Sequence, residues 1–425
     1  MARKSRSLTR LMLDAATGIA RLQRRALKLA TTTATQTAAA HAKTLKTATS
    51  KSTAAKAGTG AVPASPRKRR VGGPVAGATK AGSAALTQGA LSASPLQRSV
   101  RRGVPAVASA ATGSWVAGAF STPPMQGELI GRLDYFVYLP SSRPAAGLPL
   151  IVMLHGCSQS ASDLAAGTRM NRLAEREGFA VLYPQQSRGA QSHRCWRWFQ
   201  PEAGVGAAEA DAIANLADSV TQQYRLDPER RYVAGMSAGA GMAALVALRH
   251  AHRFAAVAMH SGAVIGAASS TSAGLSTMRR GTLRDPLTLL AGVLGANTRR
   301  GRLQDDAALP ALILQGMRDP VVAPRNAEQL TKQFLHVNGM DNETPLTTEL
   351  AVATPDAYRR LDYRRGSKTV VRVCEIAQLD HAWAGGDPAH RFHAKRGPDA
   401  SALLWRFFRS HRREGATAER SGGLP

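Results

Sequence analysis

The feature that most constrains this chain is a Gly-x-Ser-x-Gly motif between a β-prone run and a helical pattern. The run ends at Ala234, the motif occupies 235–239, and an Ala/Leu-rich pattern continues to His250. When a strand turns sharply into a helix, the serine hydroxyl is held clear of the backbone, provided that glycines let the two elements approach closely. The motif therefore predicts that Ser237 is a nucleophile. The alternative is a serine that only caps the helix.

The basic charge of the chain is concentrated in an N-terminal extension. The formal net charge is +28. Before residue 106 there are 20 Lys and Arg residues against one acid, whereas the rest of the chain has 36 against 27. Hydrophobic residues make up 44% of the sequence, which allows the remaining chain to bury a sizeable core.

The extension divides into two parts. In 1–30, apolar residues recur at spacings of three and four with basic residues between them, which predicts a basic amphipathic helix. Such a helix suits a granule, a membrane or another anionic surface through residues 8–30; the alternative is a loosely helical solubilising arm. Residues 31–126 are rich in Ala, Thr, Lys and Pro and are expected to form a disordered linker.

Specific nucleic-acid recognition and a secretory signal are not expected. The basic run at 66–70 has no interleaved aromatic residues, so any nucleic-acid binding is at most non-specific. The N-terminus does not read as a secretory signal, because charged residues interrupt its apolar stretch. We therefore expect a cytoplasmic or granule-associated protein, although the Arg-rich start also resembles an organelle transit peptide. No apolar run reaches the roughly 18 residues of a membrane span.

From 127 to 413 strand-like and helix-like segments alternate, followed by a flexible tail at 414–425. This alternation predicts one α/β domain with a mostly parallel sheet and helices on both faces. Catalytic residues are then expected at the carboxyl ends of the strands. The expected strands are 133–139, 148–154, 179–183, 232–234, 254–259, 311–314 and 369–376, and the expected helices are 162–177, 207–224, 238–250, 326–337 and 399–410.

Two further strand ends supply partners for Ser237. Asp319 follows an apolar run that ends at residue 314, and His381 follows the last expected strand. In the order Ser, Asp, His, the aspartate orients the histidine and the histidine takes the serine proton. Asp380 is the second choice for the acid, because chain neighbours seldom face each other. His250, His252 and His260 lack a comparable strand-end setting.

The loop after the strand at 148–154 is a candidate oxyanion site. It reads His155-Gly156-Cys157, and it could bring the Cys157 backbone N–H to the oxyanion while Ala238 supplies the second donor. The alternative is an ordinary β–α turn. His155 is expected to contact substrate.

A second loop carries the densest aromatic cluster of the chain. Trp196 and Trp198 beside Cys195 suggest a pocket wall, and with Trp383 they are expected to bind substrate. Cys195 could bridge to Cys157, or both could be reduced thiols. The cysteine spacing matches no zinc site, and neither a metal nor a cofactor is expected. The Gly/Ser-rich segment 266–308 is either a cap over the site or a surface Ω-loop.

With these residues in place, the chain resembles the polyhydroxybutyrate depolymerase family of esterases, which are α/β-hydrolases related to feruloyl and acetylxylan esterases. The resemblance implies the triad Ser237, Asp319 and His381, and a disulfide between Cys157 and Cys195. It is carried by Leu-His-Gly-Cys-Ser-Gln at 154–159, Gly-Thr-Arg-Met-Asn at 167–171, Tyr-Pro-Gln-Gln at 183–186, Arg-Cys-Trp-Arg-Trp-Phe at 194–199, Gly-Met-Ser-Ala-Gly at 235–239 and His-Ala-Trp-Ala-Gly-Gly at 381–386.

The expected function is hydrolysis of carboxylic esters through an acyl-enzyme, with poly(3-hydroxybutyrate) or short-chain hydroxyalkanoate oligomers as substrate. A feruloyl or acetylxylan esterase is the alternative within the family. A surface-binding or nucleic-acid-associating protein, acting through the basic extension, is the alternative from another class. Many relatives are extracellular, which is the alternative to the expected compartment.

Overall fold

The computed structural model describes residues 111–123, 131–199, 204–294, 298–299, 302–303 and 308–413. The predictions for 1–30, for the tail at 414–425 and for most of 31–126 lie outside the described residues.

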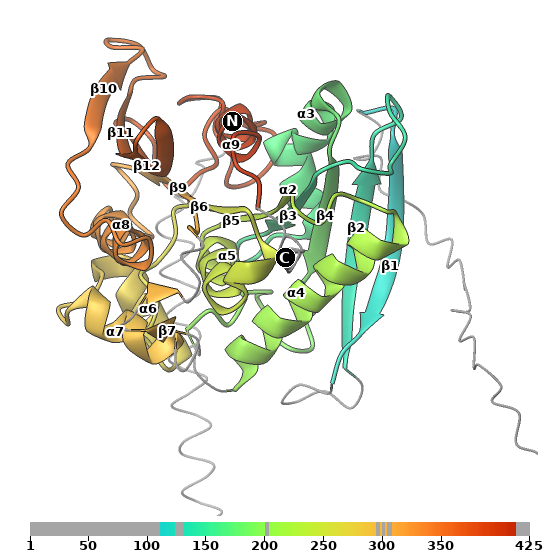
Figure 1. Cartoon of the computed structure of the whole chain (residues 1–425), viewed down its shortest axis with the longest axis horizontal. Helices are drawn as coiled ribbons and strands as arrows, with labels where there is room; N and C mark the ends of the chain where they lie inside the picture. The colour runs from blue at the N-terminus through green and yellow to red at the C-terminus, as the bar shows by residue number, and fades with distance from the viewer. Residues whose placement is uncertain are drawn as a thin grey trace, which may run out of the picture. The chain divides into compact units, whose positions relative to one another are not determined.

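A ten-stranded sheet forms the centre of the described region (Figure 1). Its middle is parallel, as the alternation of strands and helices predicts, and antiparallel strands extend both edges. In spatial order the strands are β1 (Ser114–Ser121), β2 (Arg132–Leu139), β4 (Ala180–Gln185), β3 (Leu150–Leu154), β5 (Arg231–Met236), β6 (Ala256–His260), β9 (Ala311–Gly316), β12 (Lys368–Ile376), β11 (Tyr358–Arg365) and β10 (Leu346–Leu350).

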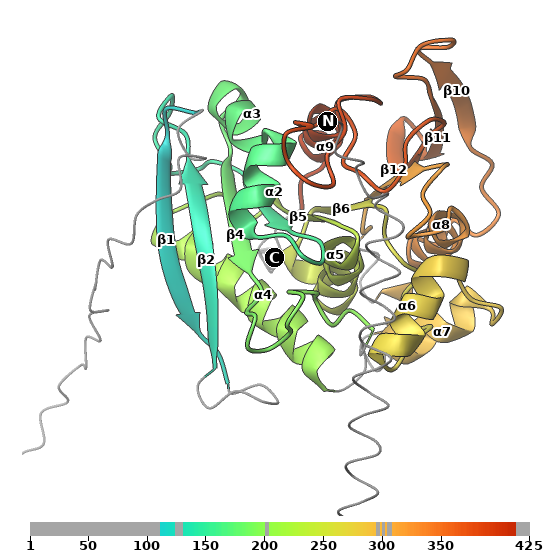
Figure 2. The same cartoon turned by 180° about the vertical axis from the view of Figure 1, so that it is seen from behind.

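Helices cover both faces of this sheet, as Figure 1 and the reverse view in Figure 2 show. Strand β5 shows why two cores form: Val233 points into one, whereas Tyr232 and Ala234 point into the other. One core includes α4 (Val205–Gln223), α5 (Ala238–Arg249) and α8 (Arg325–Val337), and the other includes α2 (Ala161–Thr168), α3 (Met170–Glu177) and α9 (Ala400–Phe408). No helix in the described ranges combines the length and apolar character that a membrane span requires.

Strand β1 corrects the boundary of the predicted linker, which extends too far at 126. Residues 114–121 pair along their whole length with β2. Trp115 stacks on Phe136 at 5.2 Å and lies 5.3 Å from Tyr183. The folded region therefore starts before 127; the strand is hard to recognise in the sequence because most of its residues are small.

The helix predicted at 162–177 is two helices. Arg169 between them has φ 54°, in the left-handed region that ends a helix. Just before it, a Cβ on Gly167 would lie 2.2 Å from the His393 ring. The absence of a side chain at Gly167 lets the end of α2 pack closely against His393.

The segment 266–308 contains helices rather than an Ω-loop. Helices α6 (Thr271–Arg280) and α7 (Pro286–Leu294) precede a short hairpin of β7 (Thr298–Arg299) and β8 (Arg302–Leu303). The buried Gln333 side chain on α8 donates from Nε2 to the carbonyls of Ile265 and Pro286 at 2.9 and 3.0 Å. The bond to Pro286 attaches the segment to α8, and the bond to Ile265 holds the residue just before the segment.

Candidate active site

Ser237 lies at the sharp turn between β5 and α5. Its φ is 58° and its ψ is −122°, a conformation that a residue with a side chain rarely adopts. A Cβ on Gly235 would lie 2.2 Å from the Gly239 carbonyl oxygen, and a Cβ on Gly239 would lie 2.1 Å from that of Leu154. Only glycine fits at either position, so the two glycines permit the strained turn that carries Ser237, which is itself 7% exposed.

Asp319 and His381 form a buried pair at the ends of neighbouring strands β9 and β12. His381 Nδ1 lies 2.8 Å from Asp319 Oδ2, while Asp319 Oδ1 accepts backbone N–H bonds from Val321 and Val322, both at 2.8 Å. Burial alone would raise the pKa of Asp319, but these hydrogen bonds outweigh it and the pKa is lowered. An ionised Asp319 can hold His381 with its Nε2 free to take a proton.

The structure also separates the two candidate acids. Asp380 is exposed, and it is Asp319 that binds His381. Within the described ranges, Ser237 Oγ forms no hydrogen bond to His381. Such contacts are often long in the absence of substrate and shorten when it binds.

The loop after β3 lies directly beside Ser237. A Cβ on Gly156 would be 3.3 Å from Ser237 Cβ. The Gly156 N–H donates to Gln159 Oε1 at 2.8 Å, and the Gly156 carbonyl lies 2.9 Å from His155 Nδ1. Because His155 Nε2 accepts the Gln186 N–H at 3.1 Å, Nδ1 carries the proton and donates. The backbone on both sides of Gly156 is thereby fixed.

The loop carries one of the two predicted oxyanion donors, Cys157, and helix α5 carries the other, Ala238. The Cys157 N–H makes no hydrogen bond within the described residues, and Ala238 is the first residue of α5, where an N–H has no acceptor inside the helix. Two unpaired N–H groups beside a nucleophile can hold a developing oxyanion. A disulfide joins Cys157 to Cys195, as the family resemblance implies.

The four predicted substrate contacts are all buried. His155, Trp196, Trp198 and Trp383 are 0%, 1%, 2% and 1% exposed. Burial lowers the pKa of His155 to about 4, and its ring lies 5.5 Å from that of Trp196. These side chains therefore offer a substrate almost no surface, which is against the prediction that all four contact substrate and that Trp196 and Trp198 form a pocket wall.

His260 is a site residue that the sequence does not reveal. It is the last residue of β6, next to β5, and its carbonyl accepts the Ser237 N–H at 2.9 Å. Its Nε2 accepts the Ala384 N–H at 3.2 Å, three residues after His381. Its place directly after the expected strand 254–259 is the signal that could have found it, so the prediction that His260 lacks a strand-end setting is wrong.

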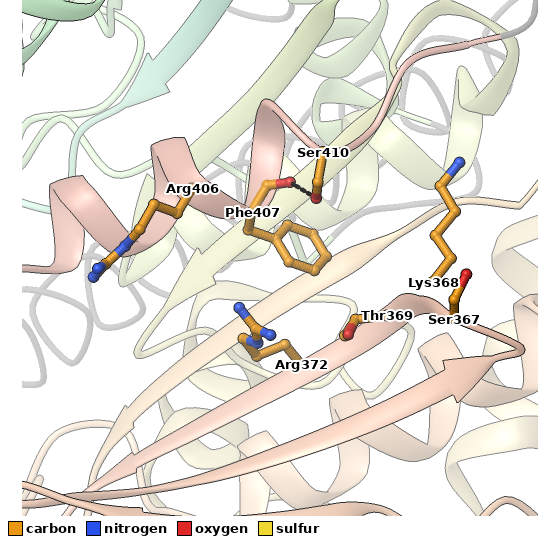
Figure 3. A pocket seen from close by; sticks show the side chains of 7 residues that line it. All are labelled: Ser367, Lys368, Thr369, Arg372, Arg406, Phe407 and Ser410. Carbon is orange, nitrogen blue, oxygen red and sulfur yellow. Dashed lines mark hydrogen bonds between the residues drawn. The ribbon is translucent and has the colours of Figure 1, made fainter.

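A pocket of about 440 Å³ opens elsewhere, between the start of β12 and the end of α9 (Figure 3). His381 follows the opposite end of β12, so this pocket is not part of the candidate active site. Its lining residues are Ser367, Lys368, Thr369, Arg372, Arg406, Phe407 and Ser410. In the part of the chain that the structure describes, no cluster of His, Cys, Asp or Glu side chains could hold a metal ion.

The known proteins that are similar in sequence to this chain include a polyhydroxyalkanoate depolymerase and an acetylxylan esterase. Poly(3-hydroxyalkanoate) depolymerase C of Paucimonas lemoignei is 34% identical over 217 residues, covering 51% of this chain and 50% of that protein. Acetylxylan esterase A of Talaromyces purpureogenus is 28% identical over 233 residues, covering 52% of this chain and 57% of that protein. The chain thus spans about half the length of these curated relatives.

Among solved structures, an acetyl xylan esterase from Aspergillus awamori matches with a TM-score of 0.55 at 18% identity, covering 69% of this chain and 99% of that one. That likeness shows the α/β-hydrolase fold. The family model described as Esterase PHB depolymerase matches residues 133–349, half of the sequence. This chain therefore belongs to the Esterase PHB depolymerase family.

Proposed function

We propose that this chain is a serine carboxylic ester hydrolase that acts through an acyl-enzyme on esters of short-chain hydroxyalkanoic acids. The observation that carries the proposal is the buried Asp319–His381 pair at 2.8 Å, which follows β9 and β12 at the sheet edge where the parallel strand β5 ends in the strained turn of Ser237. Family membership agrees with this chemistry.

The mechanism follows from the hydrogen-bond directions. His381 donates from Nδ1 to Asp319, which leaves Nε2 to take the proton of Ser237 Oγ as the oxygen attacks the ester carbonyl. The oxyanion that forms is held by the N–H groups of Cys157 and Ala238. Collapse of the tetrahedral intermediate breaks the ester C–O bond, and His381 returns the proton to the leaving alkoxide. Water, deprotonated by His381, then hydrolyses the acyl-enzyme.

The relatives support poly(3-hydroxybutyrate) or its oligomers as the substrate. The hydroxyalkanoate depolymerase is 34% identical, compared with 28% for the acetylxylan esterase. A feruloyl or acetylxylan esterase is the second candidate, because relatives of both names match about half of this chain.

The nucleophile is tested by Ser237→Ala, which should abolish hydrolysis of p-nitrophenyl butyrate. The substrate class is tested by comparing turnover of hydroxybutyrate oligomers, a feruloyl ester and acetylated xylan by the wild-type chain. Undiminished activity of Ser237→Ala contradicts the proposed mechanism. Faster turnover of either plant ester selects the second candidate.

The Cys157–Cys195 disulfide also bears on the compartment. Disulfides persist mainly in oxidising compartments, so we propose that the chain works outside the cytoplasm, in contrast to the expectation from its N-terminus. Thiol labelling of the protein from its native cells tests this proposal. Both cysteines should be protected, and labelling of both would instead place the protein in a reducing compartment.

A further inference from the structure

A loop beside His381 has a geometry that the proposed mechanism does not use. The Phe392 and His381 rings meet in a T-shaped arrangement at a centroid separation of 6.2 Å. Phe392 has φ 63°, in the left-handed region, and its carbonyl accepts the Trp383 N–H at 2.7 Å. Backbone strain of this kind persists only where the surrounding structure maintains it, and it is concentrated at functional sites. The loop is therefore held with an aromatic ring against the catalytic base.

The same loop is tied to the candidate oxyanion loop. Gln159 is 2% exposed and connects the two loops. Its Nε2 donates to the Arg391 carbonyl at 3.4 Å, and its Oε1 accepts the Gly156 N–H at 2.8 Å. Phe392 is only half-buried. Part of its ring thus remains accessible at a position fixed relative to both the base and the oxyanion donors.

Arg391 adds a positive charge on the outer side of this ring. Its guanidinium carbon lies 5.1 Å from the Phe392 ring centroid, and the residue is exposed. Within the described ranges Arg391 forms no ion pair, while Asp387 nearby is paired with Arg169 at 3.3 Å. A guanidinium that rests on an aromatic face keeps its donors available for a carboxylate.

The direction of proton transfer from His381 indicates which part of the substrate lies beside Phe392 and Arg391. His381 protonates the leaving alkoxide, so the leaving group lies on the His381 side of the scissile bond. When the substrate is an ester of two hydroxy acids, the leaving group is itself a hydroxy acid. At the carboxyl end of an oligomer, that leaving unit carries a free carboxylate.

We propose that Phe392 and Arg391 form the subsite for this leaving hydroxy acid. Phe392 contacts its alkyl part and Arg391 binds its carboxylate. The inference rests on the proposed function and names the substrate class of that site, which is oligomers with a free carboxyl end that are shortened from that end.

The test compares the dimer of 3-hydroxybutyrate as the free acid with its neutral terminal carboxamide, which contains the same scissile ester. The wild-type kcat/KM should be about tenfold higher for the free acid, the size expected for one charge-assisted hydrogen bond, with the difference mainly in KM. Arg391→Gln should bring the ratio to about one, and Arg391→Lys should keep part of it because the charge remains. Lys395→Gln removes the same charge from an exposed position of the same loop and should keep the wild-type ratio.

A second measurement needs no variant. 3-Hydroxybutyrate should inhibit hydrolysis of p-nitrophenyl butyrate competitively and about tenfold more strongly than its amide does, and salt should reduce the difference. Equal turnover of both dimers with equal inhibition overturns the subsite and leaves the esterase function intact. Cleavage of p-nitrophenyl butyrate but of neither dimer also overturns the subsite. Failure to cleave any of these esters overturns the proposed function itself.

Discussion

The ring of His260 stacks on the indole of Trp383, with the two centroids 5.1 Å apart. Together with the bond from the Ala384 N–H to His260 Nε2, this contact joins the strand next to the nucleophile to the loop that carries His381. Since Nε2 accepts, the His260 proton is on Nδ1, which lies 3.3 Å from Ser261 Oγ. Burial lowers the pKa of His260 to about 3, so the ring is neutral.

The first prediction concerns stability in acid. Burial lowers the pKa of His155 and His393 to about 4, and that of His260 to about 3. All three are neutral in the folded chain but take up a proton on unfolding below their ordinary pKa of about 6.5. Stability is therefore complete above about pH 6.5 and falls with decreasing pH by up to about 1.4 kcal/mol per pH unit for each histidine.

In His260→Gln the unfolding free energy should fall less steeply with decreasing pH, by up to about 1.4 kcal/mol per pH unit. Urea unfolding between about pH 7 and pH 5 measures this slope. The wild type measured over the same range is the reference, and a slope equal to it in His260→Gln would exclude His260 as a buried neutral group.

The second prediction separates the two candidate acids. Asp319→Asn removes the charge that orients His381 and should lower kcat by roughly 10³- to 10⁴-fold with little change in KM. Asp380→Asn makes the same substitution at an exposed residue next to His381 and should leave kcat unchanged. Steady-state kinetics on p-nitrophenyl butyrate measures kcat and KM of both variants. A larger loss of kcat in Asp380→Asn would identify Asp380, rather than Asp319, as the acid that orients His381.

The candidate catalytic groups could be selected from the sequence because each follows a local pattern. Ser237, Asp319 and His381 each come soon after a buried apolar run, and a parallel sheet brings such strand ends to one edge. The elbow could also be predicted, because Gly235 and Gly239 are required by close backbone contacts between adjoining elements.

The parts that could not be predicted depend on contacts between distant residues. His260 matters because of Ala384, which is 124 positions later in the chain. The tryptophans look like a pocket wall in sequence, but Trp383 is buried by the His260 ring and by Ser401, which accepts its indole N–H at 3.2 Å. The left-handed conformation at Phe392 has no sequence signal, because glycine is the residue expected there.

The third prediction concerns the disulfide between Cys157 and Cys195. The bridge closes a loop with a sequence separation of 38, and a loop of this length should stabilise the fold by about 4 kcal/mol through the entropy of the unfolded chain. A Cys157→Ala/Cys195→Ala variant should unfold at a correspondingly lower urea concentration. Dithiothreitol should lower the midpoint of the wild type and not that of the variant. A wild-type midpoint that is insensitive to reduction contradicts the prediction.

The last prediction tests the elbow by adding a single methyl group. In Gly239→Ala the new Cβ would lie 2.1 Å from the Leu154 carbonyl oxygen, which is a backbone atom and cannot rotate away. We expect a loss of about 3 kcal/mol in unfolding free energy, together with a fall in kcat as Ser237 loses its position. Gly189→Ala is the matched control, because its Cβ would lie 3.3 Å from the Ser187 side-chain oxygen at an exposed site, and it should change stability by less than about 0.5 kcal/mol. Urea unfolding and p-nitrophenyl butyrate hydrolysis measure both variants. If Gly239→Ala behaves like Gly189→Ala, the close approach of helix and strand does not maintain the turn, and the position of Ser237 must depend on its bond to the His260 carbonyl instead.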